Sequence, residues 1–249
     1  VFMLTSCSST APKHFSTQFN QPIAHIAIAN IDYDYKIDIR QENALFMMLG
    51  STGMMLKQVA MESNKQSYMA ENEALGQECA LRLRQLLRQQ LRSHGYQVHE
   101  SNMDYWHTMR YLHQAKVEQA NPKRRVDAVL RVQIKHLGYW SSSYDHPYQP
   151  AAMLVVSLVS PINKKIFFSK NIAIADTKSA AYTQIINKQW VDLLSGKIPE
   201  KFIYHNVYHL LDHAQQSSHG LHHIIHIAAK HISDAIKPDQ QLVMNQARE

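Results

Sequence analysis

The sequence predicts an α+β fold: a mixed, largely antiparallel sheet that contains a meander, packed by amphipathic helices and followed by a helical C-terminal region. Three observations predict it. Strand-like runs, apolar or alternating, occur near residue 25 and again in close succession between residues 126 and 174. Leucines recur at helical spacing between residues 70 and 94. A chain of 249 residues with 45% hydrophobic content is also long enough to bury a core between two such layers.

The chain opens with a short apolar run, followed by small residues, a cysteine and Ser8. This order is typical of the end of a secretory signal, and seven residues are too few to cross a bilayer. The tetrapeptide Leu4-Thr5-Ser6-Cys7 resembles the lipobox of bacterial lipoproteins. The resemblance implies that residues 1–6 end a signal peptide and that Cys7 carries a covalent lipid, such as palmitate. In that family, serine after the cysteine directs the protein to the outer membrane. The alternative is an ordinary buried cysteine near a terminus.

The polar residues 8–21 are expected to form a flexible tether, and residues 22–175 an α+β domain. Residues 23–31 are apolar on both faces, which predicts a strand inside the sheet. The acidic residues 32–38 continue this strand or form a loop. A methionine-rich helix is expected from residue 44 to about 61, buried in the domain or in a partner. Its candidate partner-binding residues are Met47, Met48, Met54 and Met55.

The clearest predicted helix runs from about residue 70 to 94. Its apolar stripe consists of Leu75, Cys79, Leu83, Leu86, Leu87 and Leu91, and Gly95 is expected to end it. Because Cys79 lies on this stripe, we expect it to pack in the core rather than to react. A short strand is predicted at residues 96–98, followed by a helix from about 103 to 116 with Asn102 as its N-terminal cap.

Between residues 126 and 135 the apolar Val126, Ala128, Leu130, Val132 and Ile134 alternate with the polar Asp127, Arg131, Gln133 and Lys135, which predicts a strand with one solvated face. A polar aromatic loop is expected from residue 139 to 149. Two further strands, at residues 151–159 and 165–174, are separated by a turn containing Pro161 and Asn163. Three successive strands with short connections predict an antiparallel meander.

This order of elements, with Val126-Asp127-Ala128-Val129-Leu130 in its best strand, resembles periplasmic lipoproteins with the fold of the curli-secretion lipoprotein and its relatives. In those proteins an Ala-Asp-x-Val-Leu strand precedes a hairpin with a Gly-Lys turn, where this chain has Asn163-Lys164. The resemblance covers residues 22–174. It implies a periplasmic domain of a secretion-type assembly, although fold similarity does not confer function.

Residues 176–237 are predicted to be helical, in segments 182–194, 202–213 and 218–237, and residues 238–249 form a polar tail. Trp190 is expected on the apolar face of the first segment. Half of the sixteen histidines lie between His205 and His231. The spacing predicts that His205, His209 and His213 share one face of a helix and that His219, His222 and His226 share a face of the next helix. The latter face points away from the core, because the apolar residues of the last helix lie opposite it.

Helical histidine pairs bind zinc or nickel when a third ligand is present. The sequence offers His219, His222 and His226 only as weak candidates, because carboxylates are scarce nearby and no His-Glu-x-x-His motif occurs. We therefore expect a solvated histidine-rich face and no metal. No nucleophile elbow or phosphate-binding glycine loop is present either, so we expect no catalytic residues and no enzyme activity.

The net charge of +6 is modest, and the arginines are not interleaved with aromatic residues, which argues against nucleic acid as a partner. We expect a lipoprotein anchored to the periplasmic face of the outer membrane by the lipid on Cys7, with no other cofactor. It would act with other envelope proteins as a structural subunit, in particular of a type IV-like secretion-system outer-membrane complex. Two alternatives stay open: a small-molecule or lipid-binding accessory lipoprotein of a transport system, and a histidine-based metal-binding periplasmic protein.

Overall fold

The computed structural model describes residues 23–33, 37–41, 66, 68, 72, 74–118, 126–141, 146–175, 191–195 and 198–237. Several predicted features lie outside these residues: the signal end, Cys7, the tether, the methionine-rich segment with Met47, Met48, Met54 and Met55, Trp190, and the tail. Within the described chain no helix is both long enough and apolar enough to span a bilayer.

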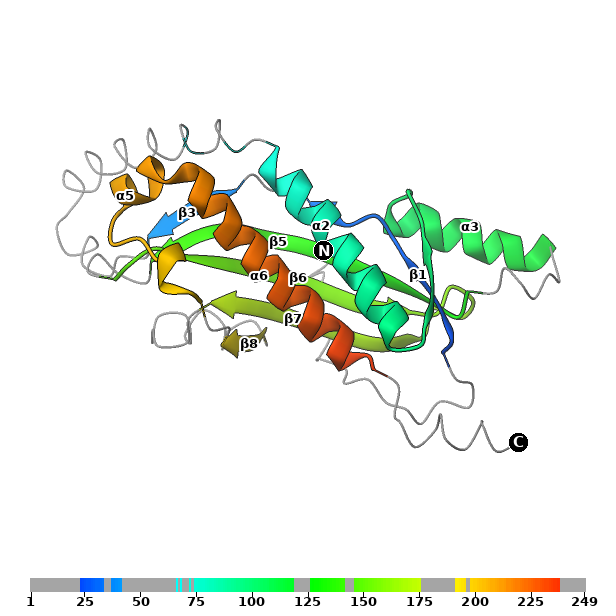
Figure 1. The fold of residues 1–249 in the computed structure, drawn as a ribbon. Helices are drawn as coiled ribbons and strands as arrows, with labels where there is room; N and C mark the ends of the chain where they lie inside the picture. Colours follow the sequence, from blue (N-terminus) through cyan, green and yellow to red (C-terminus); the bar gives the residue numbers. More distant parts are fainter. Residues whose placement is uncertain are drawn as a thin grey trace, which may run out of the picture.

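The described strands form one mixed sheet in the order β4-β1-β5-β6-β7-β8, with β2 and β3 also pairing with β5 (Figure 1). Their bounds are β1 His25–Ile28, β2 Asp32–Tyr33, β3 Asp38–Gln41, β4 Gln97–Glu100, β5 Ala128–Ser141, β6 Gln149–Val159, β7 Ile166–Ala175 and β8 Val191–Ser195. The two longest pairings, β5 with β6 and β6 with β7, are antiparallel, and the others are parallel. The α+β class and the meander are therefore confirmed, and β1 lies inside the sheet as predicted.

The loop predicted from residue 139 to 149 is wrong at both ends, because β5 continues to Ser141 and β6 already begins at Gln149. The pairing of β5 with β6 shifts register between Ile134 and His136. This bulge interrupts the alternation of apolar and polar residues, which is why the predicted strand stopped at residue 135. Pairing of β5 with β6 resumes beyond the bulge. Tyr139 then lies fully buried on the face that carries Ile134.

Three longer helices cover the sheet: α2 (Leu75–Ser93), α3 (Tyr105–Glu118) and α6 (Ala214–Ala235). Figure 1 shows α2 and α6 side by side across one face. The whole predicted stripe of α2, including Cys79, is buried there, and Gly95 ends the helix with a φ of 92°. Because α6 contributes to the same hydrophobic cluster, the C-terminal helix completes this core. The buried side of α3 packs on the opposite face, with Tyr105 and Met109 against Ala27 and Val129.

Two predicted C-terminal helices are wrong in part. Residues 191–195 form strand β8, parallel to β7, instead of the end of a helix. Pairing with β7 satisfies backbone groups that an open sheet edge would leave exposed, and this non-local effect outweighs helix propensity. The segment predicted as one helix from 202 to 213 contains the turn η3 (Glu200–Phe202), an extended stretch and the short helix α5 (Val207–Asp212). Tyr204 is extended because its backbone pairs with that of Tyr148.

Candidate functional site

Four of the five histidines of α6 border a groove of about 550 Å³ where α6, α2 and η3 meet. We call it the basic groove. Its lining residues are Glu78, Arg82 and Leu86 from α2, Pro199, Lys201 and Phe202 from the η3 segment, and His219, His222, His223 and His226 from α6. The groove therefore contains all three weak metal candidates predicted from the sequence, His219, His222 and His226. It also contains His223, which the sequence analysis did not single out.

Helical periodicity positions these side chains. Leu221, Ile224 and Ile225 are buried against the sheet and α2, so the histidines between them emerge on the other side of α6. His219 and His226 are exposed, whereas His222 is half-buried. The Nε2 atom of His222 lies 3.4 Å from a carboxylate oxygen of Glu78 on α2. The histidine face is thus partly directed at a neighbouring helix, not only at solvent.

The groove combines cations with apolar surface. Arg82 is exposed, and the ammonium nitrogen of Lys201 lies 4.9 Å from the centre of the Phe202 ring. That ring is nearly buried and lies 5.9 Å from the ring of His223. Over the residues that the structure describes, no three histidine, cysteine or acidic side chains are placed to hold one metal ion. The chemistry that this arrangement offers is recognition of an acidic group beside an apolar one.

The other predicted histidine face is arranged differently. Helix α5 ends at Asp212, so His205 precedes the helix and His213 follows it. The rings of His209 and His213 lie 4.5 Å apart, and both contact the ring of Tyr204. These histidines form an aromatic cluster with Tyr204 rather than one row along a helix.

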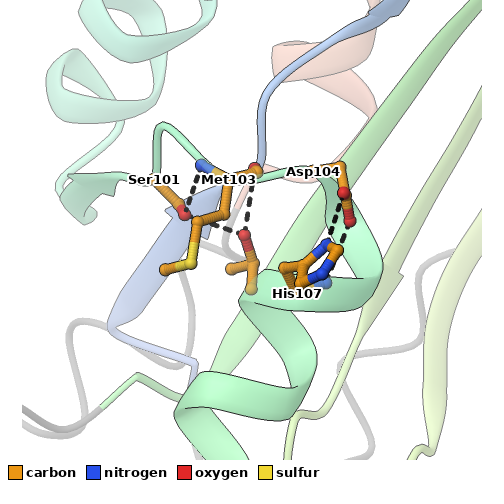
Figure 2. A network of polar contacts seen from close by, with 5 residues as sticks. Ser101, Met103, Asp104 and His107 are labelled. Carbon is orange, nitrogen blue, oxygen red and sulfur yellow. Dashed lines mark hydrogen bonds and ion pairs between the residues drawn. The ribbon is translucent and has the colours of Figure 1, made fainter.

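Helix α3 begins at a polar network shown in Figure 2. The Oδ1 atom of Asp104 accepts a hydrogen bond from the backbone N–H of His107 at 2.9 Å, and its Oδ2 atom lies 2.6 Å from Nδ1 of the same histidine. These hydrogen bonds hold the pKa of Asp104 below its ordinary value. Asp104 is therefore the N-terminal cap, and the prediction of Asn102 is wrong. The side chain of Asn102 instead accepts from Arg84, which anchors the preceding turn to α2.

The outward side of α3 carries a surface that the sequence analysis missed. Trp106 and Tyr111 on α3 are 67% and 53% exposed, and Met103, just before the helix begins, is 39% exposed; we call these three residues the aromatic face. Tyr105 is instead buried together with Met109, so the aromatic residues of α3 divide into an inner and an outer set. This separation at helical spacing was the signal available in the sequence.

The described geometry defines an α+β domain with two surfaces available to other molecules, the basic groove and the aromatic face. No protein-family model matches the chain, and no curated protein matches it. Among solved structures it is similar to the PelC dodecamer from Paraburkholderia phytofirmans, at 10% identity, with 74% of this chain and 95% of that chain covered and a TM-score of 0.32. It is also similar to lipoprotein GNA1162 from Neisseria meningitidis, at 14% identity, with 66% and 96% covered and a TM-score of 0.24.

A third similar structure is a neuraminyllactose-binding hemagglutinin homologue from Helicobacter pylori. It shows 12% identity, with 98% of this chain and 96% of that chain covered and a TM-score of 0.36. At such identities and TM-scores these structures assign the chain to no family.

Proposed function

We propose that the protein is a lipid-anchored lipoprotein of the bacterial outer membrane that acts, without catalysis, as a structural subunit of a periplasmic assembly. The assembly we favour is a type IV-like secretion-system outer-membrane complex. The lipobox-like sequence ending at Cys7 supports the anchor. Several acyl chains on one cysteine anchor a protein stably at a membrane, since each buried CH₂ contributes about 0.8 kcal/mol.

The observation that carries the subunit role is the aromatic face of α3. A tryptophan side chain buries about 150–250 Å² when covered, so covering the exposed part of Trp106 would contribute about 2–4 kcal/mol. Trp106 is also held in place: its ring lies 5.0 Å from that of Tyr105 and 6.0 Å from the guanidinium carbon of Arg131. Tryptophan, tyrosine and arginine are the residues that most often dominate protein–protein binding energy, and Arg110 is exposed on the same side of α3. The occupant proposed for this face is another protein subunit of the assembly.

The size of the detergent-extracted protein tests this role. Wild type is expected in a discrete species larger than the 28.7 kDa chain, and the double variant Trp106→Ala, Tyr111→Ala in a monomer. Leu81→Ala, which removes a 49% exposed side chain from α2, should leave the complex intact. A monomeric wild type, or equal sizes for all three proteins, would contradict the proposal. Binding of the Cys7→Ala variant to vesicles through Trp106 would assign the face to the membrane instead.

The basic groove favours a second candidate function, a small-molecule or lipid-binding accessory lipoprotein. Its volume of about 550 Å³ lies within the range of small-molecule sites, about 300–1,000 Å³. Saturable binding of a small ligand to the purified protein, with no species larger than the monomer in detergent extracts, would favour this function over the subunit role.

A further inference from the structure

The basic groove contains two cations, Arg82 and Lys201. Within the described part of the chain, neither Arg82 nor Lys201 forms an ion pair. Glu78 is the one carboxylate among the described lining residues, and it faces His222 at 3.4 Å. The groove therefore presents two permanent positive charges, while its negative charge is already directed at a histidine.

An apolar wall lies beside these cations. Leu86 and Phe202 are 8% and 6% exposed, and Pro199 is half-buried. The ammonium group of Lys201 lies over the Phe202 ring, 4.9 Å from its centre, so the cation and the ring are in direct contact. A ligand that used both would join an acidic group to a flat or apolar group.

We propose that the basic groove binds a small organic anion, in which one acidic group contacts Arg82 and Lys201 and an attached apolar group packs on Phe202. This inference rests on the second candidate function and is independent of the lipid anchor and of the aromatic face. The source of the acid is a free small molecule or the acidic head group of a lipid, because both present the same chemistry to these residues.

The charged and titratable groups that face the groove are Glu78 and Arg82 from α2, Lys201 from η3, and His219, His222, His223 and His226 from α6. Two basic side chains, Arg82 and Lys201, thus stand against the single carboxylate of Glu78 among the described lining residues. This balance of charge favours an anionic ligand.

The test uses the full chain in a nonionic detergent and benzenesulfonate as probe, because it joins a permanently charged acidic group to an apolar ring. Calorimetry at pH 7 should show saturable binding. Sulfate, which lacks the ring, and benzyl alcohol, which lacks the charge, should each bind at least tenfold more weakly. Mixed micelles containing phosphatidylglycerol should compete with benzenesulfonate if lipid is the source, and leave it bound if a free acid is.

The variants separate this site from general attraction to a basic protein. Arg82→Gln and Lys201→Gln should each weaken benzenesulfonate binding about tenfold. Lys230→Gln removes an exposed cation on α6 that does not line the groove, so it should leave binding unchanged. No binding at pH 7, equal binding of sulfate, or full binding by the Arg82→Gln, Lys201→Gln double variant would overturn the proposal. None of these results depends on lipid at Cys7 or on the size of the assembly.

Discussion

Replacing Gly220 with alanine tests how α6 packs on the sheet. A Cβ atom at this position would lie 2.2 Å from the hydroxyl oxygen of Tyr139, and 3.2 Å from the Cβ atom of Phe202. Tyr139 has no room to yield, because it is fully buried and its hydroxyl donates to the carbonyl oxygen of Ser217 at 3.0 Å. The substitution therefore forces the Tyr139 hydroxyl out of its hydrogen bond or lifts the helix.

Opposing effects determine how much Gly220→Ala changes the free energy of unfolding. Alanine in a helix interior is more favourable than glycine by about 1 kcal/mol. Overpacking costs about 1–3 kcal/mol, and displacing a buried hydrogen-bonding group costs about 1–3 kcal/mol. Gly220→Ala should therefore lower the free energy of unfolding by about 2 kcal/mol. For a chain of this length, that lowers the Tm by about 4–8 °C.

A double-mutant cycle isolates the contact. Tyr139→Phe removes the clashing oxygen, after which the nearest atom to the new Cβ is Phe202 Cβ at 3.2 Å. On this background Gly220→Ala should be neutral or stabilising by up to about 1 kcal/mol, which gives a coupling of about 2–3 kcal/mol in denaturant unfolding. Lys230→Ala, on the exposed side of the same helix, should show no coupling with Tyr139→Phe. Stabilisation by Gly220→Ala in both backgrounds would refute the reasoning, because helix propensity alone would then account for it.

Three further predictions concern the sheet, the thiol and one histidine. Leu130→Asp should lower the free energy of unfolding by at least about 4 kcal/mol because it places a carboxyl in the core, whereas Arg131→Asp should cost about 1–2 kcal/mol; equal losses of Tm would contradict the register of β5. Burial raises the pKa of Cys79 to about 12, so a thiol reagent at pH 8 should modify it only after unfolding; fast labelling of the folded protein would exclude its burial. Burial and the neighbouring His25 lower the pKa of His99 below its ordinary value of 6.5, so the unfolded state binds more protons and stability falls as the pH drops below that value. His99→Gln should make the decline in Tm between pH 7.5 and 5.5 shallower, and an unchanged slope would show that His99 does not contribute.

Local sequence patterns predicted those helices and strands whose buried side follows from a single helical or strand periodicity. The leucine stripe of α2 repeats at helical spacing, so its buried side was readable without knowing its neighbours. The alternation of β5 and the short connection from β6 to β7 predicted the meander for the same reason, and Val156 and Phe167 do lie in adjacent antiparallel strands. In each case the sequence pattern and the tertiary environment agree.

The wrong predictions concern segments whose structure depends on contacts with a distant part of the chain. Strand β8 forms because it pairs with the edge of β7. No feature of residues 191–195 alone predicts that pairing. The basic groove requires α2 and α6, which lie far apart in sequence, together with η3. The histidine spacing therefore predicted a shared face but not the residues that lie opposite it. The cap of α3 was misassigned because Asn102 and Asp104 are both good caps, and the contact of Asn102 with Arg84 on α2 settles the choice.

The intact mass of the mature protein, isolated from outer membranes, tests the central claim most directly. We predict a chain that begins at Cys7, lacks residues 1–6 and carries the added mass of acyl chains. Cys7→Ala should move the protein to the soluble fraction with an unchanged Tm, because Cys7 precedes the first strand by many residues. A mature chain that retains an unmodified Val1, or that carries an unmodified Cys7, would contradict the anchored lipoprotein on which the proposed function depends.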